Sequence, residues 1–175
     1  ACGAARFLGL RWRDIDFAKG TLNVSQSVAV VGGKLTVKAP KTERSRRTIK
    51  LPAALLPELT RHRREQSAQR LRLGLGKDQA DLVFTSPLGA MLDPQYFTEA
   101  FVREVGIAGK QVTFHALRHT HITHLLRAGV PVHVVAARAG HAKASVTLDV
   151  YSHLLGGDDD RAAEEADKML TRVLK

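Results

Sequence analysis

The sequence predicts an α+β fold that is mainly α-helical and carries a small antiparallel sheet. Two observations favour this class. Alternating segments rich in β-branched residues are confined to residues 21–52, and apolar residues recur at helical spacing over most of the remaining chain. With 175 residues, 44% of them hydrophobic, the chain is long enough to bury a core of its own. We therefore expect one main domain.

A helix followed by strands is expected at the start. In residues 3–12, GAARFLGLRW, the apolar side chains have helical spacing, and the Lys19–Gly20 turn ends the segment that follows. The segments TLNVSQSVAVV, KLTVKAP and RRTIKLP alternate between apolar and polar residues. They predict two or three antiparallel strands joined by short turns.

Helices are expected over most of the remaining chain. Residues 53–73 place leucines among basic positions, which is typical of an amphipathic helix, and residues 82–92 indicate a short extended piece and a turn. Pro94 begins a helix that ends near Gly106, and four short helices follow Thr113. The last of them, residues 158–175, begins with aspartates that complement a helix N-terminus, and we expect it to be a docking helix.

Positive charge is concentrated in one part of the chain. Lys and Arg number 27 against 17 Asp and Glu, a formal net charge of +10. A polyanion such as nucleic acid is the expected partner, although a solubilising surface would give the same sum. Residues 34–50 hold seven basic residues against Glu43 alone, which favours a phosphate-contacting face. The five arginines of residues 61–72 fit either such a face or a solvated helix.

Several classes of protein are disfavoured by what the sequence lacks. Its single cysteine, Cys2, excludes an internal disulfide framework and fits a reducing cytosol. No apolar run reaches the roughly 18–20 residues of a membrane span, and no secretory signal opens the chain. We therefore expect a cytoplasmic protein that acts away from membranes. The chain begins within an expected helix, so residue 1 is interpreted as a truncation point.

Four residues suit phosphoryl transfer. His115 and Arg118 lie one turn apart in an expected helix, so both leave the same face. His141 follows His115 by twenty-six residues, and Tyr151 comes ten residues later. A phenol can act as nucleophile, a guanidinium can clamp phosphate oxygens, and imidazoles can move protons. The set requires no cofactor.

The same residues have simpler interpretations. Histidines four residues apart are also a zinc-ligand spacing, and a lone tyrosine is usually a core residue. Zinc is disfavoured because the chain has no HExxH sequence and no acidic residue within the histidine-rich segment, so we expect no metal. His62 and His133 are interpreted as structural or surface residues.

The segments HALRH, AGHA and LDVYSH together resemble the catalytic core of tyrosine recombinases of the phage integrase family. LGLRWRDIDF is similar to the stretch after that family's first catalytic arginine, and APKTERSRRTIKLP to its β-hairpin. The resemblance implies that residues 1–175 are a catalytic domain, and that the family's N-terminal core-binding domain is absent from this chain.

The resemblance also implies a role for each residue. Tyr151 would attack the scissile phosphodiester and form a 3′-phosphotyrosine link, while Arg118 would hold non-bridging oxygens. His115 and His141 would hydrogen-bond the phosphate and assist proton transfer, and Lys41 would protonate the leaving 5′ oxygen. The expected DNA contacts are Lys38, Arg44, Arg46, Arg47 and His119.

The sequence departs from the family pattern near its start. Counting back from Leu10 places Gly3 where the family has its first catalytic arginine, and Arg6 where it has a glutamate. Loss of one such electrostatic contact costs about 100- to 1,000-fold in rate. Either the activity is impaired, or Arg6 replaces the missing group, or the first six residues are trimmed or non-native.

The leading interpretation is a site-specific DNA recombinase or integrase that works through a 3′-phosphotyrosine. Three alternatives remain: a catalytically inactive DNA-binding module, a type IB topoisomerase-like nicking and closing enzyme, and a structural zinc protein. The expected partners are double-stranded DNA and further copies of the chain, assembled into a tetramer through the C-terminal helix. The resemblance favours phage or mobile-element integration in a bacterial cell, at the nucleoid, over resolution of chromosome dimers.

Overall fold

The computed structural model describes residues 2–39, 46–76, 81–105, 112–141 and 143–151, together with 163–164, 166–169 and 171 near the C-terminus. The chain divides into two compact units, residues 1–117 and 118–175. The division falls inside helix α4, Phe114–Arg127. The first unit contains helices and small antiparallel sheets, and the described residues of the second unit contain helices, which confirms the predicted α+β class.

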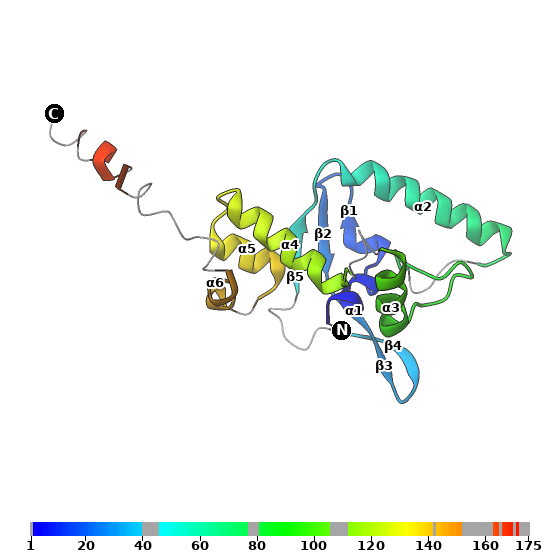
Figure 1. Ribbon diagram of the computed structural model, residues 1–175. Coiled ribbons are helices and arrows are strands. Elements are labelled where there is room, and N and C mark those ends of the chain that lie inside the picture. Colours follow the sequence, from blue (N-terminus) through cyan, green and yellow to red (C-terminus); the bar gives the residue numbers. More distant parts are fainter. Residues whose placement is uncertain are drawn as a thin grey trace. The chain divides into compact units, whose positions relative to one another are not determined.

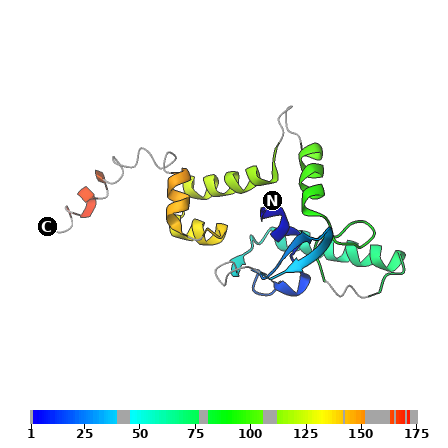
Figure 2. The ribbon, with the colours of Figure 1, turned by 90° about the horizontal axis from the view of Figure 1, so that it is seen from below.

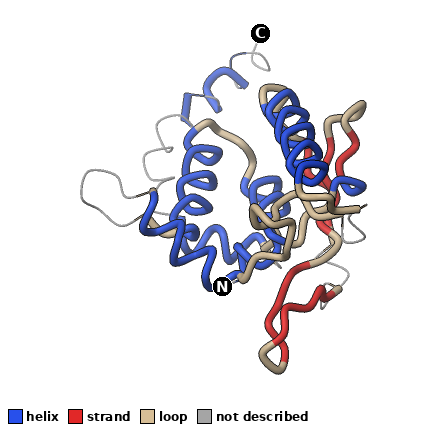
Figure 3. The backbone as a smooth tube through the Cα atoms, turned by 90° about the vertical axis from the view of Figure 1, so that its right-hand side faces the viewer, coloured by secondary structure: helices blue, strands red, loops and turns tan. Residues whose placement is uncertain are grey.

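The strands of the first unit form two separate sheets. Strands β1 (Ile15–Asp16), β2 (Thr21–Val24) and β5 (Arg47–Lys50) form an antiparallel sheet in the order β1-β2-β5. Strands β3 (Ser27–Val31) and β4 (Lys34–Lys38) pair with each other around a turn at residues 32–33 (Figures 1 and 3). The described residues therefore contain five strands, where two or three were predicted. The basic segment 34–50 does not form one hairpin, because β4 pairs with β3 whereas β5 pairs with β2.

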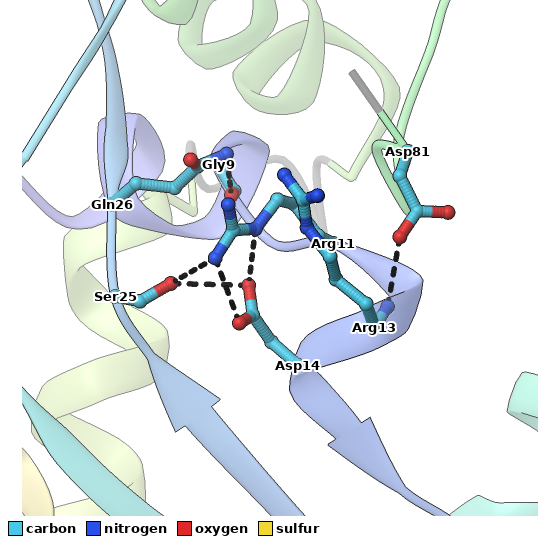
Figure 4. Close-up of polar contacts among 7 residues, drawn as sticks. All are labelled: Gly9, Arg11, Arg13, Asp14, Ser25, Gln26 and Asp81. Atoms are coloured by element: carbon cyan, nitrogen blue, oxygen red, sulfur yellow. Dashed lines mark hydrogen bonds and ion pairs between the residues drawn. The ribbon is translucent and has the colours of Figure 1, made fainter. Parts of the chain in front are cut away.

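Side chains at the junction of β2 and β3 hold the segment that precedes β1. The guanidinium of Arg11 donates to both carboxylate oxygens of Asp14, at 2.6 and 2.9 Å, and to Ser25 Oγ at 2.8 Å (Figure 4). Gln26 Nε2 donates to the carbonyl of Gly9 at 3.0 Å. Ser25 and Gln26 thus divide the predicted strand 21–31 into β2 and β3.

Helix α1, Cys2–Leu8, ends four residues before the predicted boundary at Trp12, which instead begins a short 3₁₀ turn, η1 (Trp12–Asp14). A Cβ at Gly9 would lie 2.7 Å from Ser27 Cα, so the chain passes close to β3 directly after the helix. The Trp12 N–H donates to the Asp81 carbonyl at 2.9 Å, so the backbone pairs with a distant segment instead of continuing the helix.

Two helices of the first unit begin where the sequence indicates. Asp93 accepts hydrogen bonds from the backbone N–H groups of Gln95 and Tyr96, and so caps α3 (Pro94–Glu104), with proline in its first turn. Helix α2 spans Leu55–Arg72, as expected, but none of its residues is fully buried. Leu59 packs against a core cluster, whereas Leu71 is 79% exposed, so only the first half of α2 has an apolar side against the protein.

Aromatic rings join α1, α3 and the start of α4 within the first unit. Phe7 stacks on Phe84 with ring centroids 4.0 Å apart. Phe114, the first residue of α4, meets Phe97 and Phe101 edge to face, each at 5.5 Å. These contacts fix the position of the N-terminal end of α4, where His115 follows.

The second unit contains the rest of α4 together with α5 (Val132–Ala139) and α6 (Ala144–Tyr151) (Figure 2). Its core consists of Ile122, Leu126, Val135 and Tyr151. Gly140 adopts a left-handed conformation with φ of 75° and ends α5, as the sequence indicated. Among the described residues, none of the helices has the length and apolar character needed to cross a membrane.

The predicted C-terminal helix is described only in part. Residues 163–164, 166–169 and 171 are helical, and all of them are exposed. Most of residues 158–175 therefore lie outside the described residues, and the docking role stays a prediction.

Candidate active site

Tyr151 is the last residue of α6 and is almost fully buried, with 4% of its surface exposed. Its ring packs in the core of the second unit, and its hydroxyl hydrogen-bonds to Nδ1 of His119 on α4. The two rings lie with centroids 5.8 Å apart. The structure thus places the predicted nucleophile against an imidazole.

His141 lies at the junction of α5 and α6. Its backbone N–H donates to the Ala136 carbonyl at 2.9 Å, and its Nδ1 shares a 2.7 Å hydrogen bond with Thr147 Oγ1. Thr147 is fully buried and lies one turn before Tyr151 on α6. The sequence analysis missed Thr147; its position four residues before the tyrosine was the available signal.

The positive charge of Arg118, on α4, acts on the pKa of the Tyr151 hydroxyl. Burial raises the pKa of Tyr151, and the positive charge of Arg118 opposes that shift because it favours the phenolate. The raised pKa means that the hydroxyl is protonated near neutral pH and would need a base before it could act as a nucleophile. His115 precedes Arg118 by one helical turn on α4, so the helix directs the two side chains to the same face.

His121, on the same helix, has a different partner. Arg138 Nε donates to His121 Nε2 at 3.2 Å. Burial, followed by the charges of Arg138 and His124, lowers the pKa of His121. The described residues contain no group of three or more His, Cys, Asp or Glu side chains arranged to hold a metal ion.

Three of the predicted DNA contacts lie in the described part of the first unit. Lys38 is exposed at the end of β4, Arg46 is exposed before β5, and Arg47 is half-buried in β5. Lys41 and Arg44 lie outside the described residues. The fifth predicted contact, His119, is the partner of the Tyr151 hydroxyl.

His62 and His133 lie where structural or surface residues were predicted. His62 Nε2 hydrogen-bonds to the Val83 carbonyl at 2.7 Å, and its ring lies 5.6 Å from that of Trp12. His62 is therefore a structural residue of the first unit. His133 is exposed on α5.

Gly3, which the sequence register predicts to stand at the position of the family's first arginine, lies on α1 beside the start of α4. A Cβ at Gly3 would lie 3.7 Å from two ring carbons of Phe114, which is ordinary van der Waals contact. Gly3 is exposed, and Arg6 is half-buried further along the same helix. A larger side chain therefore fits at position 3 without a clash at its first carbon.

The chain is similar to known proteins over nearly its whole length. The model of the phage integrase family matches residues 4–156. A tyrosine recombinase XerC-like protein of Caldanaerobacter subterraneus subsp. tengcongensis is 34% identical over 170 residues, which cover 90% of this chain and 44% of that protein. The ICEBs1 integrase of Bacillus subtilis is 27% identical over 174 residues, which cover 97% of this chain and 45% of the integrase. The chain thus spans less than half the length of these relatives.

Solved structures show the same fold. The Tn1549 transposon integrase, in complex with circular intermediate DNA, superposes with a TM-score of 0.74 at 23% identity, covering 94% of this chain and 55% of that one. The XerA recombinase superposes with a TM-score of 0.61 at 22% identity, covering 95% and 52%. Together with the family match over residues 4–156, this fold confirms the resemblance drawn from the sequence, and the chain belongs to the phage integrase family.

Proposed function

We propose that this chain is the strand-cleaving and rejoining domain of a site-specific DNA recombinase, an integrase of a phage or mobile element, with Tyr151 as the nucleophile. The observation that carries the proposal is the placement of the Tyr151 hydroxyl against His119, with Arg118 near enough for its charge to oppose the rise that burial causes in the phenol pKa. A nucleophile, a base and a cation for the phosphate therefore belong to one unit of the chain.

In the proposed reaction, Tyr151 Oη attacks the scissile phosphorus. As the bond from Oη to phosphorus forms, the hydroxyl proton passes to an imidazole of the site. The bond from phosphorus to the 5′ oxygen breaks, and Lys41 gives the leaving oxygen a proton. Arg118 holds the non-bridging oxygens, and His115 and His141 hydrogen-bond them. The 3′-phosphotyrosine conserves the energy of the broken bond, so the strand can be resealed without ATP or a metal ion.

We assign residues 1–175 to the catalytic domain of a longer recombinase, because the relatives it matches are more than twice as long as the matched segment. Double-stranded DNA is the proposed partner, and its site of action is the nucleoid in the bacterial cytoplasm. Self-association into a tetramer on that DNA, through the C-terminal helix, belongs to the same proposal. The proposed DNA contacts are Lys38, Arg44, Arg46, Arg47 and His119.

Covalent trapping tests the proposal. The chain is incubated with supercoiled plasmid, quenched with denaturant and examined for a denaturant-resistant protein–DNA band, in parallel with Gly3→Arg, Tyr151→Phe and Tyr96→Phe chains. Tyr96 is 61% exposed and serves as the matched control. We expect the adduct to disappear in Tyr151→Phe and to persist in Tyr96→Phe. An adduct that survives Tyr151→Phe would rule out Tyr151 as the nucleophile.

One observation favours a second function. In the register drawn from the sequence, Gly3 stands where the family has a guanidinium, and its absence would suit a DNA-binding module without catalytic activity. Salt-sensitive binding to plasmid, with no adduct even for Gly3→Arg, would select this function. Relaxation of a plasmid that lacks paired sites would instead indicate a nicking and closing enzyme.

A further inference from the structure

The contact between His119 and Tyr151 joins two helices of the second unit. His119 lies on α4, and Tyr151 ends α6, thirty-two residues later. Tyr151 is held in the core by Ile122 and Leu126 of α4, and by Val135 of α5. His119 itself is exposed, although its Nδ1 contacts the buried hydroxyl. This imidazole can therefore accept the proton of the tyrosine hydroxyl and hold it while its other side faces solvent.

We infer that His119 is the general base that takes the hydroxyl proton of Tyr151 during cleavage and returns it during rejoining. This inference rests on the function proposed above. It gives His119 a role in the reaction itself, beyond the DNA contact expected from the sequence.

The proton transfers balance in both directions. During cleavage the Oη proton moves to Nδ1 of neutral His119 as the Oη–phosphorus bond forms, and the 5′ oxygen leaves with a proton from Lys41. During rejoining the 5′ hydroxyl attacks phosphorus and returns its proton to the lysine. The tyrosine leaves and recovers its own proton from His119. A base in contact with the nucleophile contributes about 100- to 10,000-fold in rate.

His141 is less suited to this role. Its Nδ1 is engaged by Thr147 Oγ1 at 2.7 Å, and Thr147 is fully buried. This hydrogen bond orients the ring of His141, as expected for a group that hydrogen-bonds the phosphate. The base and the phosphate ligand are thereby assigned to different imidazoles.

Two substitutions at position 119 separate proton transfer from positioning. His119→Ala removes the ring, whereas His119→Asn keeps a hydrogen-bonding atom near the position of Nδ1 but cannot take up a proton. We expect both variants to form the Tyr151 adduct about 100-fold more slowly. Added imidazole should restore the rate of His119→Ala only. His133→Ala, at an exposed position of α5, is the control.

The rates of adduct formation in these variants decide whether His119 is the general base. A wild-type rate in His119→Ala or His119→Asn overturns the role as base, and a faster rate in His119→Ala would show that the contact restrains the tyrosine instead. Loss of the adduct in Tyr151→Phe, with no effect at position 119, would leave the proposed function intact and reject this inference alone. An adduct in Tyr151→Phe would reject the proposed function.

A spectroscopic measurement tests the contact without any DNA. The chain has two tyrosines, so Tyr151 is the only one in a Tyr96→Phe chain, and its ionisation can be followed by phenolate absorbance. A neutral imidazole that accepts a hydrogen bond stabilises the protonated phenol. In that background we expect His119→Ala to lower the pKa of Tyr151 and His133→Ala to leave it unchanged. An unchanged titration in His119→Ala overturns the inference, whatever the activity shows.

Discussion

The indole N–H of Trp12 donates a hydrogen bond to Oε1 of Gln66 at 2.7 Å. The amide nitrogen of Gln66 donates in turn to the carbonyls of Leu82 and Val83, at 3.2 and 3.1 Å. Both of these residues are almost fully buried. One side chain of α2 thus joins the helix to η1 and to the segment around residue 82.

Gln66→Leu should therefore destabilise the first unit. The substitution removes the Gln66 partner of the indole N–H and of the Leu82 carbonyl, whereas the Val83 carbonyl keeps its hydrogen bond to His62. Each unpaired buried polar group costs about 1–3 kcal/mol. We expect a loss of about 2–4 kcal/mol in the free energy of unfolding. Denaturant titration followed by Trp12 fluorescence measures it, because the chain has one tryptophan. Gln69→Leu, at an exposed position of the same helix, is the control, and equal stability of the two variants would contradict the prediction.

Gly9→Ala should destabilise the first unit through overpacking. The added Cβ would lie 2.7 Å from Ser27 Cα and 3.0 Å from the Gln26 carbonyl oxygen, and both atoms belong to the backbone. We expect a loss of about 1–3 kcal/mol, because β3 must move to make room. Gly76→Ala is the matched control, because nothing lies within 4 Å of a Cβ there. If thermal denaturation gives the same midpoint for both variants, the close approach at Gly9 is not rigid.

The helices were more predictable from the sequence than the strands. The start of helix α3 could be predicted locally, because the capping residue Asp93 and the first helical residue Pro94 are adjacent in the sequence. The division of residues 21–31 into two strands depends on Arg11 and Gly9, which meet Ser25 and Gln26 from 14 and 17 residues away. No local pattern contains those partners.

The candidate site shows the same limit. HALRH and LDVYSH identify His115, Arg118 and Tyr151 as candidates because the chemistry of each residue type is plain in the sequence. The pairing of His119 with Tyr151 arises only when α6 packs on α4, thirty-two residues along the chain. The burial of Thr147 against His141 likewise follows from the packing of α5 and α6 and has no sequence motif of its own.

Gly3→Arg should raise activity if position 3 is the family's first arginine. A guanidinium that stabilises the transition-state phosphate contributes about 100- to 1,000-fold in rate. We expect an increase of this order in the rate of adduct formation. Gly3→Ala, which improves helix propensity without adding charge, is the control. Equal rates for the two variants would place the first arginine elsewhere in the chain.

The stability of the second unit should fall in acid because of His121. Its pKa is lowered from an ordinary value of 6.5, so the unfolded chain binds this proton more readily than the folded one. The contribution of His121 is complete above pH 6.5 and is lost as the pH falls through the lowered pKa. We expect His121→Gln to reduce the acid-induced fall in the thermal midpoint, and His133→Gln to leave it unchanged. An unchanged acid profile in His121→Gln would show that other groups govern it.

Strand β2 pairs with β5, so the β3–β4 hairpin is inserted in the chain between two strands of another sheet. During synthesis on the ribosome the hairpin can close once Lys38 has emerged, whereas the larger sheet stays incomplete until Lys50 has followed. The register between β2 and β5 also does not fix the length of the segment that connects them. The entropic cost of closing such a loop rises only slowly with each added residue. Insertions at the hairpin tip can therefore lengthen it in evolution without disturbing the sheet beneath.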